Sequence, residues 1–452
     1  MQKPAIKLTL AVALLAVPAT TPCLAAPPTS HSIFVSEMKT VQEGDLTGPG
    51  HSMESETTIP EDAFGQKSGH FHPFVTVTAN HSDNIYRTRD NPLSDWVTTI
   101  SPGLWLAAPS SDKVLLSVSS ENAQPAGLGL FLARPEGFNR YQAYALYGAD
   151  LAYHTDYTER DNTKQAAEVF FQYNLRGGLS FNVYDKWIDS EELMYTTGSS
   201  STFSEFANNL AGALVSYDVT EKLSLRGDIN FFTLDYDNVE DKHKSRSDNA
   251  FSLYGFYNYS AKTSLFIEYR QTGIEYDNQP TLDSTQNGYY GGIQWKPTIS
   301  TRLIAKAGSE SKDYDTEGLD SLSETGVELQ LGHSFSEKSN FALTATQKLN
   351  ETLVTGTDYQ IRTYILGAYK YRFTDRINGL LNLGYEQNDF VGLTNTTNER
   401  TDDIYSYKVG ANYNLNNWLS CKLLYGYNKR ESTDYYFNYD ENTISVSLST
   451  GM

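Results

Sequence analysis

Residues 361–373 read IRTYILGAYKYRF, a stretch in which two kinds of side chain alternate. Ile361, Ile365 and Tyr369 belong to an apolar set on one parity, whereas Arg362 and Lys370 belong to a more polar set on the other. Side chains of a β-strand point alternately to opposite faces, so this period of two predicts a strand with one apolar and one wetter face. Residues 404–414 and 341–346 repeat the pattern, and no helical period of comparable length competes with it.

Paired strands of this kind are expected throughout residues 70–452, which predicts an all-β fold. From residue 141 onward we expect about sixteen strands, and residues 71–80 and 95–107 add two more. Residues 112–138 form an irregular insertion, which adds either none or two. Single-chain outer-membrane barrels have an even number of strands. We therefore expect a transmembrane, antiparallel, up-and-down β-barrel of about 18 strands, with 16 or 20 as alternatives.

An aromatic residue ends one strand of each predicted hairpin, just before a short polar turn. These residues recur at intervals of about 40, which is the length of two strands, one short turn and one long loop. Aromatic rings at one edge of a sheet are typical of a membrane–water interface. The predicted interface girdle consists of Tyr173, Tyr217, Tyr259, Trp295, Phe335, Phe373 and Tyr413. A propeller can show a similar period, but its blade packs four strands into that length.

Composition excludes several classes of protein. The 452 residues carry a formal charge of −20 and include 32 tyrosines, and the mean hydropathy is −0.47. After residue 25 no stretch approaches the ~18 apolar residues of a membrane helix, and the acidic balance disfavours nucleic-acid binding. A polar average suits a barrel, because half of each strand faces a polar lumen. Acidic residues gather in the predicted outer loops, residues 185–206 among them, while the predicted wall is mildly basic.

The N-terminus predicts a signal peptide over residues 1–25. Lys3 and Lys7 precede the apolar run of residues 8–17, and small residues follow at a plausible cleavage site. Residues 26–69 are rich in Pro, Gly, Ser and Thr and show no period, which predicts a disordered periplasmic arm. After cleavage Cys421 would be the remaining cysteine, so no internal disulfide is expected.

Basic side chains fall on the wetter parity of the predicted strands. A charge facing lipid costs roughly 2–4 kcal/mol near the midplane, so this parity is expected to face the lumen. The predicted lumen-lining bases are Arg226, Arg270, Arg302, Lys306, Lys348, Arg362, Lys370, Arg372, Lys408 and Lys422. We count Asp228, Glu268 and Glu328 as their inward acidic counterparts, and the surplus predicts a conduit that favours anionic groups such as uronates. Ion-pair ladders that brace the wall are the alternative.

The sequence contains little evidence for a metal site or a catalytic site. His70 and His72 lie near His81, but no carboxylate or thiol cluster completes a metal site, so no metal and no cofactor are expected. His154 near Asp156 does not form a convincing hydrolase arrangement, and neither does His333 with its neighbours. We therefore predict that the chain is not an enzyme.

One stretch carries a family resemblance. Residues 83–88 read DNIYRT, and a strand follows that closes on ISPGL at residues 100–104. This pattern resembles the start of the outer-membrane β-barrel porin family that is encoded with exopolysaccharide and capsule genes. The matching motif positions are Asp83, Asn84, Tyr86, Ser101, Pro102 and Gly103. The resemblance implies a barrel in the outer membrane of a Gram-negative cell, linked to polysaccharide export or surface assembly. The chain departs from the family at Met452, where such barrels end in Phe or Trp.

Two functional classes stay open. The first is a channel, either a conduit or accessory barrel for export of an anionic exopolysaccharide or a general diffusion porin. The second is a structural barrel that scaffolds an envelope complex without conducting. The expected partners are outer-membrane lipid and lipopolysaccharide, with polysaccharide and periplasmic export proteins as further candidates and no nucleic acid. The sequence does not predict the oligomeric state.

Overall fold

The computed structural model describes residues 69–111, 120–127, 140–195, 201–317, 319, 321–352, 354, 357–392 and 399–451. The predicted signal peptide, residues 26–68 of the predicted arm, and Met452 lie outside these residues. Within the described part of the chain, no helix is long and apolar enough to cross a membrane.

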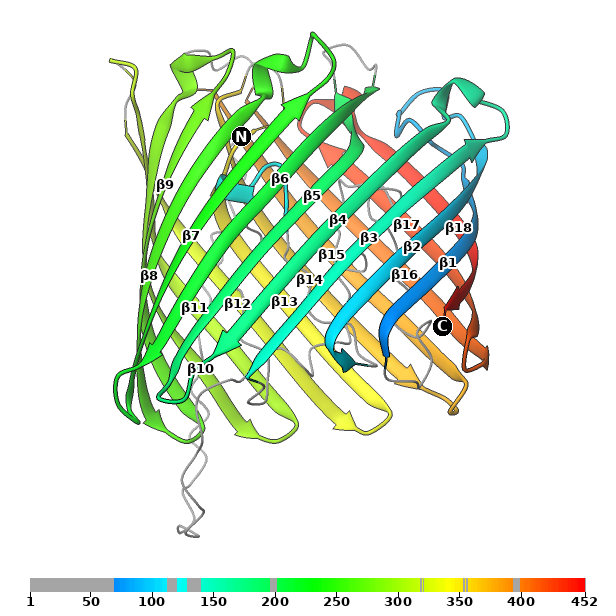
Figure 1. Ribbon diagram of the computed structural model, residues 1–452. Coiled ribbons are helices and arrows are strands. Elements are labelled where there is room, and N and C mark those ends of the chain that lie inside the picture. The colour runs from blue at the N-terminus through cyan, green and yellow to red at the C-terminus, as the bar shows by residue number, and fades with distance from the viewer. Residues whose placement is uncertain are drawn as a thin grey trace. The chain divides into compact units, whose positions relative to one another are not determined.

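The described chain forms one closed antiparallel sheet of 18 strands (Figure 1). Each strand pairs with its neighbours in sequence, and β1 pairs with both β2 and β18, which closes the barrel. The prediction of an 18-stranded up-and-down barrel is confirmed, and the alternatives of 16 and 20 strands are excluded. In chain order the strands are β1 (Gly69–Ser82), β2 (Asp95–Ser111), β3 (Tyr141–His154), β4 (Asn162–Asn174), β5 (Leu179–Tyr195), β6 (Ser201–Asp218), β7 (Leu223–Tyr236), β8 (Arg246–Ser260), β9 (Thr263–Tyr276), β10 (Ser284–Thr298), β11 (Thr301–Tyr314), β12 (Leu322–Ser336), β13 (Ser339–Asn350), β14 (Tyr359–Arg372), β15 (Ile377–Val391), β16 (Arg400–Asn416), β17 (Leu419–Ser432) and β18 (Tyr439–Gly451).

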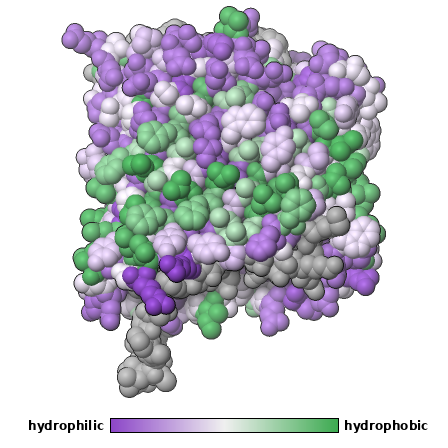
Figure 2. All heavy atoms as spheres, viewed as in Figure 1, coloured by the Kyte–Doolittle hydropathy of each residue, from purple (hydrophilic) through white to green (hydrophobic). Residues whose placement is uncertain are grey.

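The alternation of side chains sorts the two faces of the wall. In β18 the side chains of Ile444, Val446 and Leu448 are exposed on the outer face, whereas Thr443, Ser445 and Ser449 on the alternate parity are buried. The outer face therefore presents an apolar band between hydrophilic edges (Figure 2), and the polar parity points into the barrel. A closed sheet of this kind pairs its strand backbones without leaving an open edge.

One edge of the barrel carries short turns and the other carries longer connections. Residues 417–418 join β16 to β17 at the short-turn edge, whereas residues 392–399 join β15 to β16 at the long-loop edge. The predicted girdle residues lie at or beside the short turns, and all of them except the half-buried Tyr173 are exposed. In outer-membrane barrels short turns are periplasmic and long loops extracellular.

The prediction of an outer loop at residues 185–206 is wrong. Strand β5 continues to Tyr195 and β6 begins at Ser201, so most of this acidic stretch is paired sheet. Glu192 on the inner face is buried and accepts a hydrogen bond from Asn122 Nδ2 at 3.2 Å. Of the acidic residues in this stretch, Glu192 lies on the inward parity, whereas Asp185, Asp189, Glu191 and Glu205 lie on the outward parity of the paired strands. Their charge therefore does not mark a loop.

The family motif at residues 83–88 closes the seam between the first and last strands. The carboxylate of Asp83 accepts hydrogen bonds from the backbone N and side-chain Nδ2 of Asn442 at 2.7 and 2.8 Å. Asn84 Nδ2 donates to the carbonyl oxygen of Asp440 at 2.9 Å. Arg87 Nε donates to Glu441 Oε2 at 2.9 Å. These bonds attach the β1–β2 connection to β18.

The second half of the motif, Ser101, Pro102 and Gly103, lies inside β2 and pairs with β1. Gly103 faces the Phe74 ring, and a Cβ atom there would lie 2.2 Å from Phe74 Cζ. Glycine is therefore required for this ring to pack against the strand.

Candidate functional site: the barrel lumen

The connection between β2 and β3 departs from the short-turn pattern. It leaves β2 at the short-turn edge and spans residues 112–140, and its described part is residues 120–127, called here the lumen segment. Asn122, Gln124 and Ala126 are buried among inward side chains of the wall. A single 3₁₀ turn, η1 (Pro125–Gly127), ends the segment. The described part of the irregular insertion expected at residues 112–138 thus lies inside the barrel.

A buried ion pair on β8 holds the backbone of the lumen segment. Arg246 Nη2 donates to the carbonyl oxygens of Asn122 and Gln124 at 2.7 and 3.1 Å. Asp248 Oδ2 accepts from the backbone N of Ala126 at 2.8 Å. Arg246 Nε lies 3.1 Å from Asp248 Oδ1, and both side chains are almost completely buried. Their charges are therefore balanced by each other and by the segment's peptide groups.

The end of the segment packs tightly against β7. Gly127 has a φ of +63°, in the left-handed region where glycine is favoured. A Cβ atom at this position would lie 2.2 Å from Phe232 Cδ2. Both the backbone conformation and the close approach therefore require glycine.

The other end of the segment reaches a distant part of the wall. Arg362 Nη1 on β14 lies 2.6 Å from Glu121 Oε2, and its Nη2 lies 2.9 Å from Glu386 Oε2 on β15. The backbone N of Glu351, just after β13, donates to the carbonyl oxygen of Ala123 at 2.9 Å. Strands β9–β13 separate β8 from β14 around the barrel. The segment is thus attached to two separate parts of the wall and bridges the lumen.

Glu351 connects the lumen segment to charged and polar side chains of the wall. Its carboxylate pairs with Lys312 Nζ and accepts a hydrogen bond from Tyr276 Oη at 2.6 Å. Burial disfavours the charged carboxylate, but the nearby Lys312 and Arg246 outweigh burial and hold the pKa of Glu351 below its usual range.

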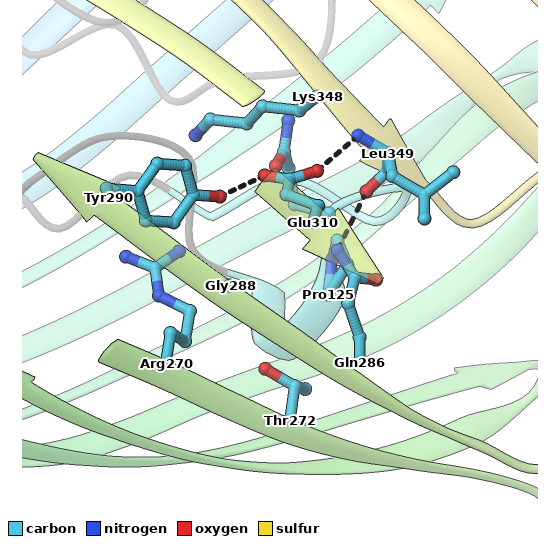
Figure 3. Close-up of a pocket in the computed structure, with 10 residues that line it drawn as sticks. Pro125, Arg270, Thr272, Gln286, Gly288, Tyr290, Glu310, Lys348 and Leu349 are labelled. Atoms are coloured by element: carbon cyan, nitrogen blue, oxygen red, sulfur yellow. Dashed lines mark hydrogen bonds between the residues drawn. The ribbon is translucent and has the colours of Figure 1, made fainter. Parts of the chain in front are cut away.

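A small pocket lies beside the segment, between it and β9–β13 (Figure 3). The Tyr290 hydroxyl donates to Glu310, whose other oxygen accepts from the backbone N of Leu349 at 2.7 Å. Pro125 of the lumen segment, Arg270 and Lys348 also line this pocket. The pocket is thus polar, and basic side chains from two strands line it.

Five of the ten predicted lumen bases lie in ion pairs with described carboxylates. Arg362 pairs with Glu121 and Glu386, as given above. The other pairs are Arg226–Asp228 at 2.6 Å, Arg270–Glu268 at 2.9 Å, Lys306–Glu268 at 2.8 Å, Lys306–Glu328 at 3.4 Å and Lys348–Glu328 at 3.7 Å. For these residues the structure shows the ladder of ion pairs that the sequence left as the alternative.

The other five bases occupy a different part of the wall. Four lie in the short-turn halves of β11, β14 and β17, and Lys408 lies at the middle of β16. We call them the basic half-wall: Arg302, Lys370, Arg372, Lys408 and Lys422. Among the described inward positions, the short-turn halves of β11–β18 contain no Asp or Glu. Basic residues of the wall are therefore concentrated toward this edge, where Arg302, Lys370, Lys408 and Lys422 also interact with other groups.

The count of three inward acids is wrong. The structure buries further carboxylates on the inner face, namely Asp150, Glu168, Glu192, Asp248, Glu310, Glu386, Asp402 and Glu441. It also adds inward bases that the sequence analysis missed, namely Lys164, Lys186, Arg246, Lys312, Arg400 and Arg430. The strands run beyond the ten or so residues needed to cross the membrane, so all of these positions except Asp150 and Glu168 fall within stretches that the sequence predicts as loops. The basic surplus is a property of one half of the wall.

The histidines are placed in structural contacts. His154 Nδ1 lies 3.0 Å from Asp95 Oδ2, so its carboxylate partner is Asp95, which is distant in sequence. His72 packs against Trp105, with ring centroids 4.8 Å apart. Within the described residues, no group of three His, Cys, Asp or Glu side chains could hold a metal ion.

Comparison with known proteins gives a family. The family model described as "Putative beta-barrel porin 2" matches residues 137–451. No curated protein matches the chain. Similar solved structures include Acinetobacter baumannii OccAB4, with 10% identity, coverage of 85% of this chain and 99% of that one, and a TM-score of 0.43. A BenF-like porin from Pseudomonas fluorescens Pf-5 has 9% identity, coverage of 84% and 99%, and a TM-score of 0.45. Pseudomonas aeruginosa OpdO has 12% identity, coverage of 86% and 98%, and a TM-score of 0.43.

Proposed function

Because this chain belongs to the outer-membrane β-barrel porin family whose model matches residues 137–451, we propose that it is a diffusion channel for small polar solutes with a preference for anions. The observation that carries the proposal is the lumen segment, which is bound to β8 through Arg246 and to β14 through Arg362. A barrel of this many strands is wide enough for an aqueous lumen. A segment bridging that lumen limits the size of the solutes that pass.

The anion preference follows from the basic half-wall. Fixed charges of one sign on low-dielectric walls raise the local concentration of counter-ions. Arg302, Lys370 and Lys422 belong to different strands, so the wall contributes basic side chains over a broad stretch of the periplasmic half of the lumen. A solute with a carboxylate, such as a sugar acid, would be favoured over a neutral solute of the same size.

Two other functions remain candidates for this barrel. Export of an anionic exopolysaccharide, which the family resemblance implies, would require the lumen segment to leave its contacts with Arg246 and Arg362. A non-conducting scaffold would require no open path. The bridging segment favours the small-solute channel over the polysaccharide conduit.

The test uses the purified full-length chain in planar bilayers and in liposomes. We expect single-channel current, a reversal potential that indicates anion preference in a salt gradient, and liposome swelling with monosaccharide acids but not with long oligosaccharides. Absence of current in assembled barrels would favour the scaffold, and passage of long oligosaccharides would favour the conduit. Cation preference would contradict the proposed role of the basic half-wall.

A further inference from the structure

Basic side chains recur along the short-turn edge of the barrel. The turns at residues 175–178, 219–222, 261–262, 337–338 and 373–376 each contain an exposed Lys or Arg, and a further exposed Arg directly precedes β3 at the same edge. We call these six residues the basic turn ring: Arg140, Arg176, Lys222, Lys262, Lys338 and Arg376. Within the described part of the chain, none of them forms an ion pair with a carboxylate.

Acidic residues at this edge are fewer. The exposed acidic residues of the same five turns are Glu221, Glu337 and Asp375. The half-buried Asp218, at the end of β6, accepts a hydrogen bond from Ser224 Oγ at 2.8 Å. Six exposed bases thus accompany three exposed acids, and the edge is net positive although the whole chain carries a formal charge of −20.

Two members of the basic turn ring lie at the depth of the aromatic girdle. Arg140 Nε donates to Tyr173 Oη at 3.0 Å, and its guanidinium carbon lies 5.8 Å from the centre of that ring. Lys262 Nζ donates to the carbonyl oxygen of Pro297, two residues beyond Trp295, at 2.9 Å. Interfacial Tyr and Trp rings lie at the level of the lipid headgroups. These two bases are therefore placed where the headgroups begin.

Both bases keep hydrogen-bond donors for a ligand. The two terminal nitrogens of Arg140 have no partner among the described residues, and Lys262 Nζ can donate two bonds besides the one to Pro297. A guanidinium matches phosphate geometry with two parallel donors, and an ammonium supplies a compact charge. The donors that remain suit a phosphate at the membrane surface.

We propose that the basic turn ring binds anionic phospholipid headgroups in the periplasmic leaflet of the outer membrane. Lipid surrounds a membrane barrel at the depth of its girdle, so headgroups are the groups that these bases meet. Anionic lipid attracts basic residues next to a membrane. A phosphatidylglycerol headgroup has a phosphate without a compensating ammonium, so it is favoured over a zwitterionic one. The long-loop edge does not suit such a ligand, since residues 313–317 contain three acids and no base.

Native mass spectrometry of the purified full-length chain tests the lipid preference. The probes are phosphatidylglycerol and phosphatidylcholine with identical acyl chains, and their binding can be measured whether or not the barrel conducts. We expect the dissociation constant for phosphatidylglycerol to be lower by about fivefold or more. Equal constants for the two lipids, or displacement of phosphatidylglycerol by excess inorganic phosphate, would overturn the proposal.

Two matched variants test the residues themselves. The short-turn variant carries Arg140→Gln, Arg176→Gln and Lys262→Gln. The control variant changes the net charge equally at the long-loop edge, through Arg89→Gln, Lys242→Gln and Lys429→Gln. We expect the short-turn variant to lose the preference for phosphatidylglycerol and the control variant to keep it, with heat-modifiable migration showing that both are assembled. An equal loss in both variants, or a preference retained by the short-turn variant, would overturn the proposal.

Discussion

Arg362 on β14 joins the lumen segment to the wall through Glu121, with 2.6 Å between Nη1 and Oε2. The same guanidinium pairs with Glu386 at 2.9 Å, so one planar group is shared by two carboxylates from different parts of the fold. Arginine suits this role because its donors form a rigid fork. The lumen segment is thereby fixed at the side of the barrel away from its contacts with β8.

Replacing Arg362 tests this attachment. Arg362→Gln leaves Glu121 and Glu386 without their shared cation, and breaking a buried pair from one side costs about 3–5 kcal/mol. We expect a lower thermal midpoint and a larger, noisier single-channel conductance, because the segment is then held mainly from β8. Lys429→Gln, which breaks an exposed pair with Glu431, is the control and should change neither. Unchanged conductance in Arg362→Gln would show that this bond does not restrict the pore.

Gly127 provides a test of the β7 side of the segment. Gly127→Ala combines a left-handed backbone, which costs about 1–2 kcal/mol for a residue with a Cβ atom, with overlap against Phe232. We expect displacement of the segment and altered conductance. Gly177→Ala is the matched control, since φ is also positive there but nothing lies within 4 Å of the added atom. Equal effects of the two substitutions on conductance would show that close packing against Phe232 does not position the segment.

The seam between β1 and β18 predicts an assembly defect. Asp83→Ala removes both acceptors for the half-buried Asn442, and an unsatisfied polar group costs up to about 1–3 kcal/mol when it is buried. We expect less heat-modifiable barrel in the membrane and a lower thermal midpoint. Asp90→Ala, an exposed change in the same connection, should behave like the unmodified chain. Normal assembly of Asp83→Ala would mean that the motif does not serve the seam.

Removal of residues 443–452 should block assembly more completely. Most of β18 would be lost, and both β17 and β1 would be left with an open edge. Quantitative immunoblotting of outer-membrane fractions measures the outcome. Membrane levels equal to those of the full chain would contradict the closed sheet.

The basic half-wall predicts a change in selectivity without a change in assembly. Converting Lys370, Lys408 and Lys422 to Gln together should move the reversal potential toward that of an unselective pore, because the local positive field falls. Converting Lys222, Lys262 and Lys338, which are exposed in short turns, provides a control with the same change in net charge. If the control shifts the reversal potential equally, the wall lysines do not set the selectivity.

Much of the barrel could be predicted from the sequence because membrane strands impose a strict alternation. The pattern of residues 361–373 corresponds to β14, and the repeat of about 40 residues gave the correct strand number. Strand ends were less predictable. Residues 185–195 extend β5 although they are acidic. The partners of Glu192 inside the barrel, Asn122 and Tyr236, are far away in sequence, so no local pattern reveals them.

The lumen segment could be located but not interpreted from the sequence. Pro125 and Gly127 marked an irregular insertion, yet its path depends on contacts with Arg246, Asp248 and Arg362 that no local pattern reveals. The inward direction of the ten bases followed from the period of two. The period of two did not predict the partners of these bases, because pairs such as Lys306–Glu268 join different strands.

The most direct test of the account compares single-channel conductance in the unmodified chain and in a variant whose residues 120–127 are replaced by a Gly-Ser stretch of the same length. The replacement removes the carboxylate of Glu121 that pairs with Arg362 and the tight packing of Gly127 against Phe232. We predict anion-selective current from the unmodified protein and a clearly larger conductance from the variant, with both chains assembled as heat-modifiable barrels. The same conductance from both chains, or no current from either, would contradict a channel narrowed by the lumen segment.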